Sequence, residues 1–381
     1  MEYTQFKEVL AKSSFSQKLK SIYVTKLEEK SVSIVMGNPS CDQDSFIGSH
    51  VLGVVLNRVP VVNMSKKIFS CKKDLLKVLE VMDVSVEDLV FLEKHPEGWV
   101  FVRGGKTIKF SEKEITATLI DHNFPCTELL TQKNFTVDHI IDHHPILEAS
   151  DMYNNVSGLC IDLNAGSCCS LIYNYIKTFL GSDMVDLSIE FGYLVLLIIP
   201  VVTDTSFLSK RTHKVDTIAV NELLEMTNIP KSSAEALYAS LKKAKQCEDN
   251  IESDLILQMD YKAFDYPPSG KGKTFGMSSV KYGLDAWVQR DGKEKFLKTL
   301  QHFVEEKKHQ FFLINSKTKG VREFFLFGNP GANFPSVTMY DGGAVNSRQI
   351  NGDPELTVYS TDPLLSRKLI APKIYQYLEK Q

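Results

Sequence analysis

The chain has 381 residues, with 44 lysines and arginines against 47 aspartates and glutamates, so its formal net charge is −3. This balance, together with 43% hydrophobic residues, is typical of a globular protein and argues against a general nucleic-acid or membrane-surface binder. Seven cysteines without a CxxC pair, and an N-terminus without an apolar signal run, argue against a secreted disulfide scaffold, so we expect a cytoplasmic protein.

The first half of the chain alternates apolar runs with helical periodicity. Helices are expected over 45–58 and 72–83, where apolar residues recur three and four positions apart. Strands are expected at 31–38, 59–64, 88–94, 115–120 and 135–141. Because these strands are continuously apolar and separated by helices, they predict an α/β domain with a doubly wound, mainly parallel sheet.

The most apolar stretch runs from Phe191 to Val202. It is shorter than the roughly 20 residues that span a bilayer, and it contains Gly192 and Pro200. We therefore interpret this stretch as core and expect no membrane association.

The second half changes in texture after Asp204. Residues 211–246 are polar and helical with a break at Ile229-Pro230, and we interpret them as a linker region. Beyond it, a helix is expected over 293–309, and strands are expected at 310–317, 321–329, 336–343 and 356–362. Closely joined strands predict a smaller α+β domain with a mainly antiparallel sheet, which gives expected domains at 1–220 and 221–381.

Four polar clusters follow apolar runs, and each contains an aspartate. They are GNPSCDQD at 37–44, DHN at 121–123, DHH at 142–144 and TDT at 203–205. In an open parallel sheet, ligands bind beyond the carboxyl ends of the strands, so these clusters are expected to converge on one edge. Such convergence predicts a site.

Simpler interpretations stand beside this one for three clusters. Asp42 and Asp44 can face one cation-rich region while Gln43 points away, but Asp44 or Ser45 could instead cap the following helix. The DHN tripeptide could be only a turn, and Asp204 could be only a cap.

The DHH cluster is harder to explain as structural. Two adjacent histidines behind an aspartate are costly to bury unpaired, whereas neutral imidazole is a common metal ligand whose tautomer a carboxylate can fix. Oxygen ligands with one or two histidines favour Mn²⁺ or Mg²⁺ over structural zinc. A pair of such ions activates water for attack on phosphorus, which predicts a phosphoesterase.

At these clusters the chain resembles the DHH phosphoesterase superfamily. The resemblance is to the branch with a DHHA2-type second domain, which holds eukaryotic exopolyphosphatases, prune-like proteins and family II inorganic pyrophosphatases. It rests on the four motifs between residues 37 and 205 and on SRKLIAP at 366–372, which is similar to the branch's C-terminal Ser-Arg-Lys motif. The fold that it implies places the active site in a cleft between the two domains.

The resemblance also implies roles for individual residues. Two divalent cations, Mg²⁺ or Mn²⁺, would be held by five of them, with Asp121 as the bridge. The implied metal ligands are Asp42 and Asp121 for one ion, and Asp44, Asp121, His143 and Asp204 for the other. Asp142 would orient the histidines, and His144 would contact phosphate, so His144 joins the five ligands in the expected catalytic set.

The expected substrate contacts are Asn38, His144, Ser366, Arg367 and Lys368. Arg367 would bind phosphoryl oxygens by its planar fork and Lys368 as a point charge. Asn38 is a departure, because the pyrophosphatases have histidine there, and asparagine is similar to the exopolyphosphatase and prune-like members. Whether Asn38 touches metal stays open, and its weaker ligand character makes Mg²⁺ a candidate activator.

Two further segments have alternative interpretations. Gly166 to Ser170 opens an apolar helix and could present N–H groups to phosphate, or Gly166 could simply allow close packing. Arg348 in NSRQ at 346–349 could contact a longer substrate or be a solvated surface residue.

The sequence thus predicts a metal-dependent exopolyphosphatase that releases terminal orthophosphate from inorganic polyphosphate, as a monomer that binds neither nucleic acid nor membrane. A prune-like short-chain polyphosphatase or nucleotide phosphodiesterase, a pyrophosphatase and a partner-binding scaffold are the alternatives. Lysine-rich runs could guide a polyanion or could be solvated faces. These runs lie at 241–245, 270–273, 305–309 and 316–320.

Overall fold

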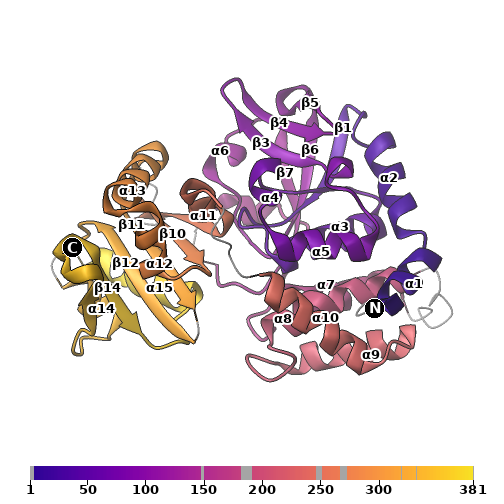
Figure 1. Ribbon diagram of the computed structural model, residues 1–381. Coiled ribbons are helices and arrows are strands. Elements are labelled where there is room, and N and C mark those ends of the chain that lie inside the picture. The colour runs from indigo at the N-terminus through magenta and orange to yellow at the C-terminus, as the bar shows by residue number, and fades with distance from the viewer. Residues whose placement is uncertain are drawn as a thin grey trace. The chain divides into compact units, whose positions relative to one another are not determined.

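The computed structural model describes residues 4–146, 150–181, 191–245, 251–266, 273–318, 320–331 and 333–380 (Figure 1). The chain forms two compact units, Met1–Lys245 and Gln246–Gln381. Of the lysine-rich runs, most of 270–273 and Lys319 lie outside the described residues.

Unit 1 is built on a five-stranded sheet in which every neighbouring pair is parallel. Its order is β2 (Val59–Val61), β1 (Ser31–Met36), β6 (Glu114–Ile120), β7 (Phe135–Asp142) and β8 (Gly158–Ile161). The chain leaves β1 toward β2 on one side and later returns to place β6 on the other side. The carboxyl ends of β1 and β6 therefore flank a topological switch point, where α/β sheets bind ligands.

The helices of unit 1 surround this sheet. They are α1 (Thr4–Lys12), α2 (Phe15–Thr25), α3 (Gln43–Leu56), α4 (Lys66–Phe69), α5 (Lys73–Met82), α6 (Thr127–Leu130), α7 (Cys168–Leu180), α8 (Ile198–Asp204), α9 (Lys214–Thr227) and α10 (Lys231–Ala244), with 3₁₀ turns at Val86–Asp88, Phe110–Glu112, Asp151–Asn155 and Gly192–Leu197. Helix α3 is buried on all sides from Gln43 to Val54. It approaches its neighbours closely at Gly48, where a Cβ would lie 2.6 Å from Ile172 and 2.8 Å from Ile120.

The expected strand at 88–94 does not belong to the parallel sheet. It corresponds to β3 (Phe91–His95), which pairs antiparallel with β4 (Gly98–Arg103), and β4 pairs with β5 (Lys106–Lys109). The strand itself is confirmed, and among the described residues its link to the parallel sheet is an isolated parallel bridge between Phe91 and Val62. Only Pro96 and Glu97 separate β3 from β4, so its main pairing is an antiparallel hairpin.

The apolar stretch from Phe191 to Val202 lies in the core of unit 1. Its members from Tyr193 to Val202 in the hydrophobic cluster are at most 2% exposed. Within the described residues, no helix is both long and apolar enough to cross a membrane.

The helices expected after Asp204 are present as α9 and α10, with Pro230 immediately before α10. Their apolar faces, including Ala219, Leu223 and Leu237, are buried in the hydrophobic cluster of unit 1. This segment is therefore packed structure, not a linker, and the division between units falls after Lys245, later than the expected position near residue 220. The many polar residues on the outer faces of α9 and α10 conceal their buried stripes.

Unit 2 is a smaller α+β unit, as predicted. Its sheet has the order β13 (Ser347–Gln349), β14 (Thr357–Thr361), β12 (Val321–Gly328), β11 (His309–Thr318), β10 (Lys273–Val280) and β9 (Tyr261–Tyr266), in which only β10 and β11 are parallel. Its helices are α11 (Ser253–Met259), α12 (Leu284–Asp291), α13 (Lys293–Lys307), α14 (Phe334–Met339) and α15 (Arg367–Leu378), with 3₁₀ turns at Ile350–Gly352 and Pro354–Leu356.

Alternate side chains of the unit 2 sheet enter two separate cores. Phe312 and Ile314 of β11 belong to one hydrophobic cluster, and Phe311 and Leu313 belong to the other. This is the two-residue period of a strand covered on both faces.

The strand expected at 336–343 is instead helix α14 followed by a turn. Phe334, Thr338 and Met339 are buried, and the Thr338 hydroxyl donates to the Phe334 carbonyl at 2.7 Å. The buried positions thus follow a helical period, which the alternating letters of SVTMY concealed.

A buried polar network joins three elements of unit 2. The ring of His309 has Nε2 at 2.5 Å from the Tyr261 hydroxyl and Nδ1 at 2.6 Å from the Thr274 hydroxyl. Burial, with a smaller contribution from Lys307, lowers the pKa of His309 to about 4. The folded state therefore holds this ring neutral.

Acidification should for this reason destabilise unit 2. The stabilising contribution of neutral His309 is complete above pH about 6.5 and is lost as the pH falls toward 4, with a slope of at most about 1.4 kcal/mol per pH unit. Urea unfolding between pH 4 and 7 should show a shallower pH dependence for His309→Gln than for the unmodified chain. The exposed Gln310→Ala is the control, and equal slopes for all three proteins would contradict the assignment.

Candidate metal centre

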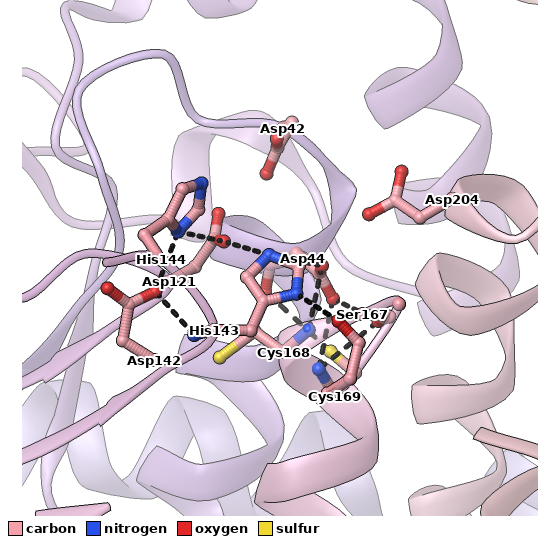
Figure 2. A network of polar contacts seen from close by, with 12 residues as sticks. Asp42, Asp44, Asp121, Asp142, His143, His144, Ser167, Cys168, Cys169 and Asp204 are labelled. Atoms are coloured by element: carbon pink, nitrogen blue, oxygen red, sulfur yellow. Dashed lines mark hydrogen bonds and ion pairs between the residues drawn. The ribbon is translucent and has the colours of Figure 1, made fainter. Parts of the chain in front are cut away.

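The predicted ligands gather at the carboxyl edge of the parallel sheet (Figure 2). Asp42 and Asp44 lie at the start of α3, directly after the loop that leaves β1, and Asp121 follows β6. Asp142 ends β7 and is followed by His143 and His144, while Asp204 ends α8. The switch point between β1 and β6 explains why segments so far apart in sequence meet here.

Asp42 is the N-cap of α3, and its Oδ1 accepts from the Ser45 backbone N–H at 3.1 Å. The capping interpretation thus holds, but for Asp42 and not for Asp44 or Ser45. Gln43 points away from the site, as expected, and its amide bonds to Asp74 and to the Thr203 hydroxyl.

The Asp44 carboxylate lies at the N-terminus of α7. It accepts from the Ser167 hydroxyl at 2.5 Å and from the backbone N–H groups of Cys168 and Cys169, both at 3.0 Å. These donors and the helix dipole favour a negative charge at this place. In the structure a carboxylate of the protein, and not a phosphate, thus occupies these donors.

Close packing at Gly166, the other interpretation of this segment, agrees with the structure. A Cβ on Gly166 would lie 2.3 Å from the carbonyl oxygen of Arg211 and 2.9 Å from the Asp216 carboxylate. Only glycine fits without displacing one of these groups.

Asp121 adopts a left-handed backbone conformation, with φ of 58°. Its Oδ2 accepts from the Asn38 amide at 2.6 Å and from the Ser45 hydroxyl at 2.8 Å. Its Oδ1 faces the two histidines, at 3.3 Å from His143 Nε2 and 3.7 Å from His144 Nδ1. One oxygen is thus fixed by the protein while the other is turned into the cluster.

Asn38 uses both ends of its amide within the protein. Its nitrogen donates to Asp121, and its oxygen accepts from the backbone N–H of Ser40 at 2.9 Å and from the Ser40 hydroxyl at 2.6 Å. The side chain is 1% exposed. In the structure Asn38 thus positions Asp121, and its amide oxygen is used by Ser40, while its expected contact with substrate stays a prediction.

His143 gives the clearest indication of a cation. Its Nδ1 lies 3.1 Å from the Ala165 carbonyl, which can only accept, so Nδ1 carries the hydrogen. Nε2 is therefore the atom that faces Asp121 Oδ1 at 3.3 Å and Asp44 Oδ2 at 4.0 Å. Without a cation, a proton on Nε2 satisfies these oxygens. A divalent cation could take its place, because a ring nitrogen beside buried carboxylate oxygens is a donor set that such ions bind.

His144 is oriented by Asp142. Its Nδ1 lies 2.7 Å from Asp142 Oδ1, which also accepts from the His143 backbone N–H, and Asp142 Oδ2 accepts from the Asn123 amide at 2.7 Å. The fully buried Asp142 thus fixes the His144 tautomer, as carboxylates beside metal-site histidines do. Ligand atoms of Asp121, His143 and His144 lie within 4.8 Å of one another.

The concentration of buried carboxylates shifts their ionisation in the absence of a cation. Burial raises the pKa of Asp44 and of Asp121, and each is raised further by a neighbouring aspartate. Burial, followed by the charges of Asp44 and Asp42, raises the pKa of Asp204 to about 8. Positive charge among these groups would reverse the shifts, which is a second observation that fits divalent cations.

Unit 2 contains the remaining predicted residues. Ser366 is the N-cap residue of α15, and Arg367 begins that helix beside Lys368. The Arg367 guanidinium donates to the Asp260 carbonyl at 2.8 Å and to its carboxylate at 2.6 Å. Arg348, in contrast, forms exposed ion pairs with Asp285 and Glu323, which agrees with its surface interpretation.

Sequence reasoning missed several residues that hold the ligands. All but Asp216 lie within or next to a segment that drew attention for another reason. The missed residues are Ser40, Ser45, Asn123, Ser167 and Asp216. Asn123 could have been identified, because it belongs to the DHN cluster at the end of β6. Its amide donates to Asp142 at the end of the neighbouring strand β7.

Comparison with known proteins adds an independent result. The DHHA2 domain model matches residues 239–377. A Schizosaccharomyces pombe protein named as a candidate exopolyphosphatase is 29% identical over 68% of this chain and 66% of its own length. The rat exopolyphosphatase PRUNE1 is 22% identical over 79% of this chain and 64% of its own length, so the chain spans slightly less than two thirds of each of these relatives.

The fold has a solved counterpart. The crystal structure of a candidate family II inorganic pyrophosphatase from Methanococcus jannaschii aligns with 91% of this chain and 100% of its own, with a TM-score of 0.63 at 20% identity. This likeness confirms the predicted architecture of a parallel-sheet domain followed by a smaller second domain.

Loss of the Asn38 amide should loosen Asp121 and weaken cation binding. For Asn38→Ala we expect Mn²⁺ affinity, measured by calorimetry on the full chain, to fall about 10- to 100-fold, as is typical when a residue that orients a metal ligand is removed. Asn134→Ala is the matched control, because the Asn134 amide also donates two hydrogen bonds, but to the backbone carbonyls of Phe110 and Lys113 and not to a carboxylate of the centre. Unchanged affinity in a folded Asn38→Ala protein would contradict this role.

Proposed function

We propose that the chain, which is similar to exopolyphosphatases and carries a match to the DHHA2 domain, belongs to the DHH superfamily and is a metal-dependent phosphoanhydride hydrolase. The substrate that we propose is inorganic polyphosphate, from which the enzyme releases terminal orthophosphate. The names of the relatives support this choice of substrate. The arrangement of His143 among buried carboxylates is the observation that carries the proposal of metal-dependent hydrolysis.

We assign two divalent cations, Mg²⁺ or Mn²⁺, to five side chains. Asp42 and Asp121 would hold one ion, and Asp44, Asp121, His143 and Asp204 the other. The inward Oδ1 of Asp121, close to both histidines, supports its assignment as the shared ligand. When bound, such a pair neutralises phosphoryl oxygens and makes an attacking water more acidic.

His144 is assigned to the phosphate. With Nδ1 held by Asp142, the ring can be protonated at Nε2, and the Asp142 carboxylate stabilises the resulting imidazolium. His144 would then donate from Nε2 to an oxygen of the substrate, either at the attacked phosphorus or on the departing chain. It is the one member of the expected catalytic set that we assign to proton transfer.

Arg367 and Lys368 of unit 2 are proposed to bind the phosphoryl oxygens of the chain. Asp260 already holds the Arg367 guanidinium in a fixed orientation, which lowers the entropic cost of binding an anion. Cytoplasmic location, a monomeric state and the lack of nucleic-acid binding stay predictions from composition.

The proposed substrate can be tested by orthophosphate release from long polyphosphate, tripolyphosphate and pyrophosphate, each with Mg²⁺, Mn²⁺ or EDTA. We expect metal-dependent release from the long chain and little from pyrophosphate. Preference for tripolyphosphate would indicate a prune-like short-chain enzyme, and preference for pyrophosphate would indicate a pyrophosphatase. No release from any substrate with either metal would contradict hydrolysis of inorganic phosphoanhydrides and leave the nucleotide phosphodiesterase or scaffold alternatives.

Asp204→Asn should abolish orthophosphate release while leaving the fold intact, because the change removes a ligand charge but preserves side-chain shape. Circular dichroism would verify the fold. Asp138→Asn is the control, since Asp138 of β7 pairs with Arg58 instead of facing the centre. An active Asp204→Asn enzyme would refute the assigned ligand set.

Arg367→Lys should weaken the use of substrate without changing the affinity for metal. Loss of the planar fork is expected to lower kcat/KM on polyphosphate by about tenfold or more, while Mn²⁺ affinity stays unchanged. Arg348→Lys, on the surface of the same unit, provides the comparison and should retain full activity. Equal kcat/KM for both variants would exclude Arg367 from substrate binding.

A further inference from the structure

Asp216 is a buried carboxylate that the proposed mechanism does not use. It lies in the first turn of α9, is 0% exposed, and accepts hydrogen bonds from four residues. One of them, the His213 backbone N–H at 2.7 Å, belongs to the capping box of α9 itself. The other three belong to the start of α7, which is distant in sequence.

The start of α7 is held tightly by this carboxylate. The Gly166 N–H lies 2.9 Å from Asp216 Oδ2, the Ser167 N–H lies 3.3 Å from Oδ1, and the Ser170 hydroxyl lies 2.7 Å from Oδ1. The segment therefore cannot shift along its axis without breaking several charge-assisted bonds.

The same segment positions two proposed metal ligands through its remaining polar groups. The Ser167 hydroxyl and the N–H groups of Cys168 and Cys169 hold Asp44, and the Ala165 carbonyl holds His143 Nδ1. Residues 165–170 thus connect Asp216 to the centre, since one set of donors serves Asp216 and another serves Asp44.

A third ligand is linked to Asp216 by the loop between α8 and α9. The Arg211 side chain donates to the Asp204 carbonyl at 2.9 Å. The Arg211 carbonyl packs against Gly166, where even one added carbon would lie 2.3 Å away. Asp216, Gly166 and this loop therefore fit together directly behind Asp44, His143 and Asp204.

We propose that Asp216 is a positioning residue for the cation held by Asp44, His143 and Asp204. It fixes the start of α7 so that all three ligands approach one point, and it touches neither the cation nor the substrate. This inference rests on the proposed metal centre, but not on the identity of the substrate. A purely structural role would affect the stability of unit 1 without changing the cation affinity of the folded protein.

The test compares Mn²⁺ binding by the unmodified full chain, Asp216→Asn and Glu222→Gln, using calorimetry and the electron paramagnetic resonance of bound Mn²⁺. An amide at 216 keeps the shape but directs N–H hydrogens toward N–H donors. We expect Asp216→Asn to remain folded and to bind Mn²⁺ about 10- to 100-fold more weakly, with an altered spectrum. Glu222→Gln, which removes a carboxylate from the same helix where it pairs with Lys177, should bind normally.

Unchanged Mn²⁺ affinity in folded Asp216→Asn would overturn the proposal. Should that variant not fold, Ser170→Ala takes its place, because it removes one bond to Asp216 and leaves the bonds to Asp44 intact. A smaller loss of affinity in the same direction would support the proposal, and no loss would overturn it. Normal Mn²⁺ binding without polyphosphate hydrolysis would refute only the proposed function, whereas no Mn²⁺ binding by the unmodified chain would refute both.

Discussion

The structure of unit 1 depends on one electrostatic constraint, which is that several carboxylates and the imidazole of His143 share a buried space. Asp44, Asp121 and Asp142 are at most 2% exposed, and among the described residues their ion-pair partners are histidines, not lysine or arginine. Burying such charge is costly unless hydrogen bonds or cations compensate for it. This cost explains why hydrogen-bond donors surround the buried carboxylates.

Neutral donors compensate for each acid, but to different extents. Both oxygens of Asp142 and of Asp44 accept hydrogen bonds, whereas Asp121 has one oxygen held by neutral donors and the other directed at the centre. At Asp121, Asn38 and Ser45 hold Oδ2, and the histidines lie near Oδ1. The left-handed backbone of Asp121 is a local strain that these bonds sustain. The centre is thus preorganised by neutral donors, and its remaining negative charge is what a cation would neutralise.

The sequence locates the proposed metal ligands better than it locates the residues that orient them. Asp121, Asp142 and His143 stand at strand ends, so the direction of a parallel sheet is enough to bring them together. Asn38 was expected to contact the substrate. Its position in the motif places it near the centre but does not reveal in which direction its amide points. Asp216 gave no signal, since a carboxylate in the first turn of a helix is ordinarily a local cap. Residues 336–343 begin as a helix instead of a strand, and the helices after Asp204 pack into unit 1 instead of forming a linker. Both expectations failed because short amphipathic segments show their period only against a known core.

The proposed ligands are spread along the chain, from Asp42 at the first strand to Asp204 at the end of α8. No fragment that stops short of α8 contains the complete set, and the start of α7 that holds Asp44 is itself held by α9. During synthesis on the ribosome, the centre can therefore form only after nearly all of unit 1 has emerged. Assembly of the site is in this way coupled to completion of the domain, and a nascent chain cannot acquire a functional centre before it has a finished core.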